Sequence, residues 1–160
     1  MAGATISELE RLYRGRYRIF VRVALAITRD DELAAEAVQE AFLLAIRGRR
    51  RFRASGSLEA WVWRSVVNEA KRLAARARSE PTAGVEASRN GAADDEAALR
   101  GLIGALPERQ RLAVFLRYYG DLDYRAIGEV LGVKIGTVSA MLCAAHRSLR
   151  EAMESQGVRS

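Results

Sequence analysis

Cysteine and histidine are scarce in this sequence of 160 residues, which contains one of each, Cys143 and His146. A single cysteine excludes an internal disulfide and a metal cluster held by cysteines alone. A single histidine excludes a metal site with two histidine ligands. We also find no nucleophile, base and oxyanion donors that could act together. We therefore assign no catalytic residues, no metal site and no cofactor, and we expect that the protein is not an enzyme.

Long apolar stretches are missing as well. No segment approaches the roughly 20 apolar residues that a membrane-spanning helix needs. The N-terminal sequence MAGATISELERLYR lacks the basic start and the apolar core of a secretory signal peptide. We therefore expect no membrane insertion and a cytoplasmic location.

Proline occurs only twice, at Pro81 and Pro107, where helices are expected to pause or begin. Elsewhere apolar residues recur at spacings of three and four, which predicts amphipathic helices. Residues 79–93 show no such periodicity and are rich in small, polar and acidic residues, so they predict a flexible linker. The predicted helices cover residues 5–28, 32–47, 58–78, 94–104, 107–119, 124–132 and 135–154.

Charge is distributed unevenly around this linker. The net charge is +6, but residues 1–78 hold sixteen Lys and Arg against nine Asp and Glu, and residues 98–160 hold nine against six. Residues 79–97 hold one Arg and five acids. We expect an all-α fold with two small helical domains, of three and four helices, at 1–79 and 98–160, joined by a flexible acidic linker at 80–97. Two basic blocks suit a polyanionic partner contacted at two places, although a solvated basic surface explains the charge as well.

The segment DYRAIGEVLGVKIGTVSAMLCAAHRSL, residues 123–149, has the pattern of a helix-turn-helix. Gly132 suits the left-handed end of the first helix, and Val133 is expected to be buried in the turn. A generic helical hairpin is the alternative. From Ile135 to Ala145 the second helix carries no Lys, Arg, Asp or Glu, so it lacks the bidentate Arg contact to a base that is worth about 1–3 kcal/mol. This helix should read DNA weakly by itself.

The predicted helix 58–78 carries a polar face opposite its apolar stripe. Three cations around an amide on this face suit the phosphates and one unstacked base of a single-stranded nucleic acid. The preceding RGRRRFR has five Arg among residues 47–53, which suits a salt-dependent grip on phosphates. A solvated loop is the alternative. The polar face consists of Arg64, Asn68, Lys71 and Arg72.

Taken in order, these motifs resemble those of an extracytoplasmic-function (ECF) sigma factor, the smallest class of bacterial RNA polymerase specificity subunits. The resemblance is carried by LAAEAVQEAFLLAI, SLEAWVWRSVVNEAKRLAARAR, the acidic segment, and LPERQRLAVFLRYYGD with the helix-turn-helix after it. It implies a protein that binds core RNA polymerase and directs promoter recognition, melting and transcription initiation. The implied partners are the clamp helices of the polymerase's largest subunit, the polymerase flap, promoter DNA and an anti-sigma factor.

The resemblance also assigns roles to residues of this chain. AEAVQE matches the family motif that docks on the clamp helices, although an ordinary solvated helix face is the alternative. Trp61 matches the family's usual tryptophan and is expected in the core, whereas Trp63 is expected to be only partly covered. The set for core polymerase is Glu36, Gln39, Glu40, Phe42 and Leu43. The set for the minus-ten element is Arg49, Arg50, Arg51, Arg53, Arg64, Asn68, Lys71 and Arg72. The set for the minus-thirty-five element is Lys134, Gly136, Thr137, Ser139, Ala140, Met141, Ala144 and Arg147.

The last helix departs from the family pattern, because GTVSAMLCAAHRSL stands where many relatives have basic residues. We hypothesise that polymerase docking and the minus-ten contacts hold the protein on the promoter, so that weak contacts by this tethered helix suffice. Two other functions stay open from the sequence. One is a regulator that binds duplex DNA through its helix-turn-helix without polymerase, and the other is a sigma mimic that titrates an anti-sigma factor.

Overall fold

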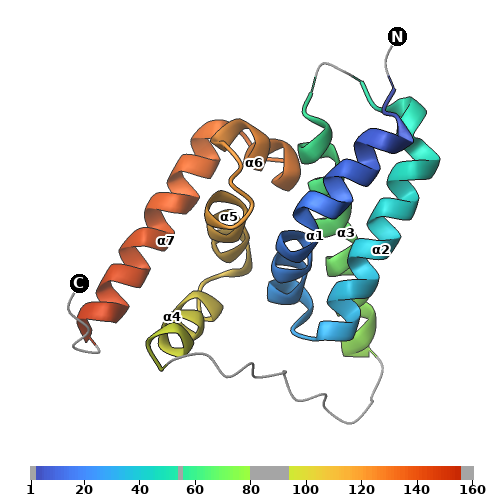
Figure 1. Cartoon of the computed structure of the whole chain (residues 1–160). Coiled ribbons are helices and arrows are strands. Elements are labelled where there is room, and N and C mark those ends of the chain that lie inside the picture. Colours follow the sequence, from blue (N-terminus) through green and yellow to red (C-terminus); the bar gives the residue numbers. More distant parts are fainter. Residues whose placement is uncertain (1–2, 54–55, 80–93, 156–160) are drawn as a thin grey trace.

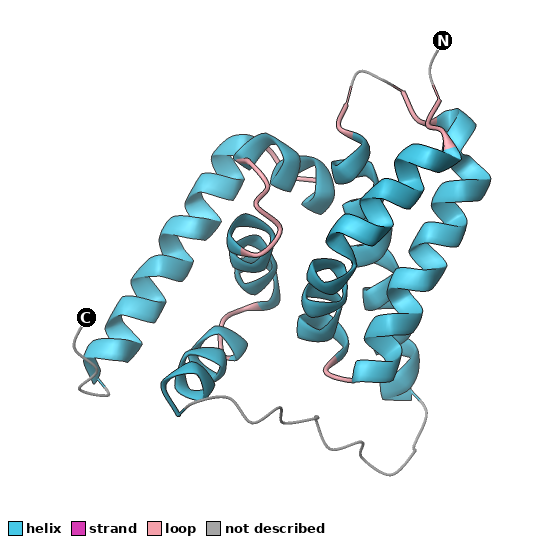
Figure 2. Ribbon diagram, in the orientation of Figure 1, coloured by secondary structure: helices cyan, strands magenta, loops and turns pink. Residues whose placement is uncertain are grey.

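The computed structural model describes residues 3–53, 56–79 and 94–155. Within these residues the chain forms helices and no strand (Figure 2), which confirms the all-α prediction. Residues 80–93 of the predicted linker lie outside the described residues, and its last four residues begin a helix. The helices are α1 (Ile6–Thr28), α2 (Asp31–Gly48), the short 3-10 helix η1 (Arg49–Arg51), α3 (Leu58–Ser79), α4 (Asp94–Gly104), α5 (Glu108–Tyr118), α6 (Tyr124–Leu131) and α7 (Ile135–Ser155).

Polar side chains just before the helices explain where these helices begin. Thr5 and Glu8 form a capping box at α1, in which the Thr5 hydroxyl accepts from the Glu8 amide at 3.1 Å and the Glu8 carboxylate accepts from the Thr5 amide at 2.7 Å. Asp30, Ser57 and Asp123 each accept the amide three residues further on, at 3.0, 3.3 and 2.8 Å.

An aromatic cluster fills the core between α1, α2 and α3. The ring of Phe20 lies 4.3 Å from Trp63 and 5.4 Å from Phe42, measured between centroids. Trp63 is fully buried and Trp61 is half-buried, so the expectation for the two tryptophans is wrong. The reason is that the ring of Trp63 packs against Phe20 of α1, whereas Trp61 lies at the edge of the part of α3 that is covered.

The helix-turn-helix consists of α6, the turn after it and α7. Gly132 ends α6 with the left-handed φ of 69°, as predicted, and half-buried Val133 donates its amide to the Gly128 carbonyl at 2.9 Å. A Cβ on Gly128 would lie 2.7 Å from the Val133 carbonyl oxygen, so this close turn requires glycine. No single helix among the described ranges is long and apolar enough to cross a membrane; α6 and α7 pass that test only together, and they are bent by 99° at the turn.

The two halves of the chain pack against each other. Helix α6 lies against α3 and α5 lies against α1 (Figure 1). The buried apolar residues of both halves belong to one continuous cluster. The sequence predicted two helical domains, and the structure adds that the helix-turn-helix half covers part of the N-terminal three-helix half.

Candidate functional site

The outward face of α2 combines acidic, amide and apolar side chains. Glu36, Gln39 and Leu43 are exposed and Glu40 is half-buried. They lie on one side of the helix because positions three and four apart are neighbours. Leu43 stands out because it is apolar and yet 46% exposed. Four of the five residues predicted to bind core polymerase therefore share one accessible face.

Phe42, the fifth residue of that set, belongs to the core instead. It is 5% exposed and packs edge-to-face against Tyr13 at 4.9 Å. Its buried ring forms the floor of a groove of about 470 Å³ between α1 and α2, here named the α1–α2 groove. Ile6 lines this groove from α1 and is 53% exposed. The sequence missed the α1 side because the groove forms only when the two helices pack. The α1–α2 groove is lined by Ile6, Leu9, Glu10, Tyr13, Gln39, Phe42, Leu43 and Ile46.

Arg72 lies with the acids of α2 and α3 and not with the other cations of the minus-ten set. Its guanidinium donates to the Glu69 carboxylate at 2.8 and 3.0 Å. The hydrogen bond and charge of Glu69 raise the pKa of Arg72 above its ordinary value, and the charges of Glu40 and Glu36 add smaller contributions. Arg72 and Arg64 are both exposed on α3, but Arg72 is paired with a carboxylate of its own helix, so its role in binding the minus-ten element stays a prediction.

Arg49 also has a structural role. Its guanidinium donates to the Ile46 carbonyl at 2.7 Å, near the end of α2, and its backbone amide donates to the same oxygen. Its own carbonyl accepts the Ala4 amide at 2.9 Å, which ties the N-terminal segment down. The guanidinium of Arg49 is half-buried, whereas Arg50, Arg51 and Arg53 are exposed.

Arg51, Arg53 and Arg64 converge with aromatic rings in a pocket of about 370 Å³, here named the arginine pocket. The rings of Phe52 and Trp61 stand 5.6 Å apart at 51° in its wall. Trp61 is half-buried because its other side faces this pocket. Cationic groups around aromatic rings suit the phosphates and bases of an unpaired strand. The arginine pocket is lined by Arg51, Phe52, Arg53, Gly56, Ser57, Ala60, Trp61, Arg64 and Glu129.

From Ile135 to Ala145 the outer face of α7 consists of small and uncharged residues. Gly136, Thr137, Ala140 and Arg147 are exposed, whereas Ser139 and Ala144 are half-buried. Met141 packs partly against the core, because it borders the buried stripe through Val138 and Leu142. Cys143 is exposed on the same face.

A second cleft, of about 890 Å³, lies between α3 and the helix-turn-helix. It brings Arg64 of α3 together with Lys134 and Thr137 of the predicted minus-thirty-five set. Arg109 and Arg125 also line it. The sequence gave no signal for these two arginines, because only the packing of the two halves places them beside Arg64.

Two parts of the chain match models of the sigma-70 family. Residues 12–80 match sigma-70 region 2, and residues 96–149 match sigma-70 region 4. The ECF RNA polymerase sigma factor SigM of Mycobacterium tuberculosis is 32% identical over 144 residues, which cover 87% of this chain and 73% of SigM. This chain belongs to the ECF RNA polymerase sigma factors. The RNA polymerase sigma-H factor of Pseudomonas aeruginosa is 28% identical over 177 residues, and the match covers 91% of this chain and 92% of the sigma-H factor.

Solved structures share the fold of this sigma factor. CnrH, solved in complex with the cytosolic domain of CnrY, superposes with a TM-score of 0.73 at 16% identity. The superposition covers 95% of this chain and 91% of the CnrH chain. The sigma factor RpoE, solved with the anti-sigma factor NepR from Bartonella quintana, also superposes with a TM-score of 0.73, at 18% identity. This match covers 93% of this chain and 98% of the RpoE chain. The predicted family and the predicted function as an RNA polymerase sigma factor are confirmed.

The structure brings Arg51, Arg53 and Arg64 together in the arginine pocket and leaves Asn68 and Lys71 exposed further along α3. Which of these groups touch polymerase or promoter DNA stays a prediction that rests on the geometry.

Proposed function

We propose that this sigma factor grips an unpaired promoter strand in the arginine pocket, docks on polymerase through α2, and uses α7 as a weak second DNA contact. The observation that carries the proposal is the arginine pocket itself. There Phe52 and Trp61 stand beside the guanidinium groups of Arg51, Arg53 and Arg64. Such a pocket offers stacking for a base and cations for its phosphates.

In the proposed complex the minus-ten element is melted and one of its bases enters the arginine pocket. Stacking on an aromatic ring is worth about 1–3 kcal/mol per base, and half-buried Trp61 is the ring placed to provide it. Arg50, Asn68 and Lys71 are exposed, and in the proposed complex they hold the flanking nucleotides. Arg49 and Arg72 act indirectly, by fixing the end of α2 and the acidic face of α2.

The polymerase docks on the α2 face and the α1–α2 groove. Exposed leucine and isoleucine at the rim of a groove mark a surface that a partner covers, and Leu43 and Ile6 occupy that rim. Glu36, Gln39 and Glu40 supply charge and hydrogen bonding for a basic helical partner, which we take to be the clamp helices of the largest subunit.

The α7 face adds a modest contact to the minus-thirty-five element. Its exposed small residues, Gly136, Thr137 and Ala140, permit close approach to the major groove, and Lys134 and Arg147 reach phosphates. Because this half is held by the polymerase flap and by the rest of the chain, its effective concentration at the promoter is high and weak contacts suffice. The chain acts by binding and catalyses no reaction of its own, and it works in the cytoplasm, where the chromosome and polymerase are.

An anti-sigma factor controls this sigma factor by covering the same α2 face and groove. The sigma factor RpoE, which shares the fold, is solved with the anti-sigma factor NepR. An exposed apolar rim is a surface for which polymerase and an inhibitor can compete.

Run-off transcription with core polymerase on a library of promoter fragments tests the proposal. The double variant Arg51→Ala/Arg53→Ala should bind core polymerase normally but lose open-complex formation, measured by permanganate reactivity of unpaired thymines. The control Arg14→Ala/Arg18→Ala removes the same charge from the exposed side of α1 and should initiate normally. Equal loss in both variants would show that net charge, not the pocket, is responsible.

A further inference from the structure

The segment that precedes α1 lies against the 3-10 helix at the end of α2. Gly3, Ala4 and Thr5, here named the clip, run beside Arg49 and Arg50 of η1, where the start of α1 meets the end of α2 (Figure 1). We infer that the clip positions the arginine pocket for the promoter strand. The inference rests on the proposed role of that pocket, and it adds residues that act on the strand only through the loop that carries the pocket.

The clip is joined to η1 by a backbone hydrogen bond. The Ala4 amide donates to the Arg49 carbonyl at 2.9 Å, and the same oxygen accepts the Phe52 amide at 3.3 Å. The side chain of Ala4 is 7% exposed, so this part of the clip is packed against the protein. One carbonyl oxygen therefore connects the clip to Phe52, whose ring stands in the wall of the arginine pocket.

Gly3 gives the clip a backbone conformation that other residues rarely adopt. Its φ is 151°, which glycine tolerates because it has no Cβ. A Cβ built on Gly3 would lie 3.7 Å from the Arg49 carbonyl oxygen and 3.7 Å from the Cα of Arg50, which is ordinary contact distance. Space would therefore allow an alanine, and only the backbone conformation opposes it. Gly3→Ala strains the clip without a steric clash.

Thr5 fixes the other end of the clip to α1. Its hydroxyl and its amide exchange hydrogen bonds with Glu8 in the capping box. Helix α1 in turn packs along α2 and α3. The clip is therefore a short bridge between a long, well-packed helix and η1.

The 3-10 helix η1 is weak by itself. A 3-10 helix has poorer hydrogen-bond geometry than an α-helix, and η1 consists of three consecutive arginines whose charges repel one another. The Arg49 guanidinium is held by the Ile46 carbonyl, but Arg51 and Phe52 beyond it line the pocket. A hydrogen bond from outside this segment, such as that of Ala4, therefore limits how far the loop can shift.

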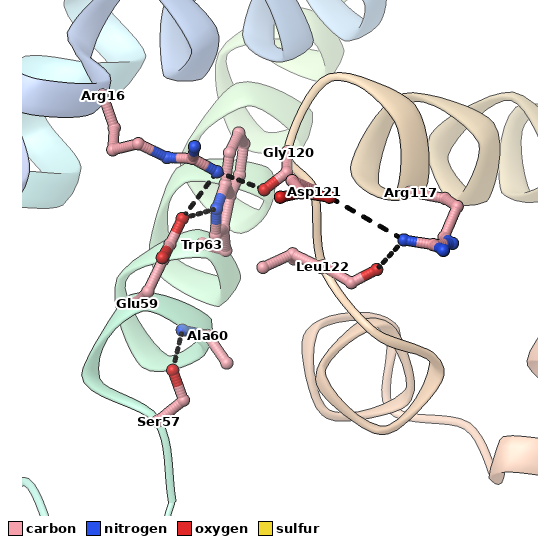
Figure 3. A network of polar contacts seen from close by, with 9 residues as sticks. All are labelled: Arg16, Ser57, Glu59, Ala60, Trp63, Arg117, Gly120, Asp121 and Leu122. Atoms are coloured by element: carbon pink, nitrogen blue, oxygen red, sulfur yellow. Dashed lines mark hydrogen bonds and ion pairs between the residues drawn. The ribbon is translucent and has the colours of Figure 1, made fainter.

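The opposite wall of the pocket belongs to α3, which is anchored independently of the clip. The Glu59 carboxylate accepts from the Trp63 indole N–H at 3.4 Å and pairs with Arg16 of α1 at 2.8 Å (Figure 3). Arg16 also donates to the Gly120 carbonyl. These contacts fix the first turn of α3 and with it Trp61, which lines the pocket. The separation of the two pocket walls therefore depends on where the clip holds η1.

Loss of the clip should impair promoter melting and leave polymerase docking intact. Deletion of residues 2–4 removes Gly3 and Ala4 but keeps Thr5 and its capping box. If the released loop takes the native arrangement about a fifth of the time, the apparent affinity for the strand falls about fivefold. The holoenzyme of this deletion variant should therefore form about fivefold fewer open complexes on a promoter recovered by run-off transcription, measured by permanganate reactivity. Its Kd for core polymerase should equal that of the wild type.

A single substitution keeps the test decisive if the deletion variant unfolds. Gly3→Ala should lower open-complex formation by about threefold, because the native φ strains a residue with a Cβ. Gly15→Ala is the matched control on exposed α1, where a Cβ meets nothing within 4 Å, and it should initiate like the wild type. Hydrogen exchange of the amides of residues 49–53 should be faster in both clip variants and unchanged within α2. Wild-type exchange in both clip variants would overturn the inference.

A double-variant cycle distinguishes positioning of the pocket from a general loss of structure. Trp61→Ala removes the ring that is proposed to stack on the base. In this background the deletion of residues 2–4 should lower open-complex formation by less than about twofold further, because changes that act through one set of contacts are not additive. A full additional fivefold loss would show that the clip acts elsewhere and would refute its positioning role.

The arginine variant separates this inference from the proposed function. If Arg51→Ala/Arg53→Ala loses open-complex formation while both clip variants initiate like the wild type, the positioning role is refuted and the proposed function stands. If Arg51→Ala/Arg53→Ala initiates like the wild type, the proposed function fails and the positioning role fails with it. Loss of open complexes in the arginine variant and in both clip variants, but not in Gly15→Ala, would support both.

Discussion

Leu43 and Phe42 are neighbours on α2, and truncating each of them to alanine distinguishes a residue that docks on polymerase from a residue that stabilises the core. Leu43 is 46% exposed at the rim of the α1–α2 groove, so docking can bury about half of its side chain. Full burial of a leucine is worth about 1.5–3 kcal/mol, which makes the share of Leu43 about 1 kcal/mol. Leu43→Ala should therefore weaken binding to core polymerase about fivefold and leave the free energy of unfolding nearly unchanged. Phe42→Ala should instead cost about 3–5 kcal/mol of stability.

Leu44 provides a matched control, because it is the next residue, 43% exposed, and outside the groove lining. The single exposed cysteine, Cys143, accepts a fluorophore, so polymerase binding can be followed by anisotropy and stability by urea unfolding. Leu44→Ala should bind polymerase like the wild type. If Leu44→Ala weakened docking and Leu43→Ala did not, the docking face would be placed on the wrong side of α2.

Three further predictions concern stability. Trp63→Ala should lower the free energy of unfolding by about 3–5 kcal/mol, seen in urea titrations, because this ring is fully buried; a loss below 1 kcal/mol would contradict its place in the core. Gly128→Ala should lower the melting temperature, because its Cβ meets a carbonyl at 2.7 Å, whereas Gly136→Ala meets nothing within 4 Å and should not. Hydrogen bonds from the amide and hydroxyl of Thr5 lower the pKa of Glu8 below its usual 4.5. The capping box should therefore stabilise the protein above pH 4.5 and lose that contribution as the pH falls through the lowered pKa, and Thr5→Ala should flatten the pH dependence.

The helices and the family could be predicted from the sequence because their signals are local. Spacings of three and four mark each helix, and a short polar side chain such as Asp30 or Asp123 marks its start. Gly132 marks the turn in the same way, because the end of the helix needs a residue that adopts the left-handed conformation easily, and glycine, which lacks a Cβ, does so. These features do not depend on which other helix lies opposite.

The errors arise where two elements meet. The expectations for Trp61 and Trp63 were wrong because the packing of the helices decides which ring meets Phe20 of α1 and which faces the arginine pocket. The pairing of Arg72 with Glu69 is a local pair three residues apart within α3, whereas the nearness of Arg72 to Glu36 and Glu40 of α2 follows from the packing of the helices. The contacts of Arg16 join residues about 40 and 100 positions apart, and no periodicity encodes such pairs.

The account depends most on the claim that the α2 face carrying Gln39 and Glu40 binds core polymerase. The most direct measurement is the Kd of the labelled double variant Gln39→Ala/Glu40→Lys for core polymerase, beside a Glu154→Lys control with the same charge change on exposed α7. The account predicts at least a tenfold weaker Kd for the double variant, with helix content and unfolding free energy close to wild type, and no change for the control. A double variant that folds and binds polymerase as tightly as the wild type would contradict it.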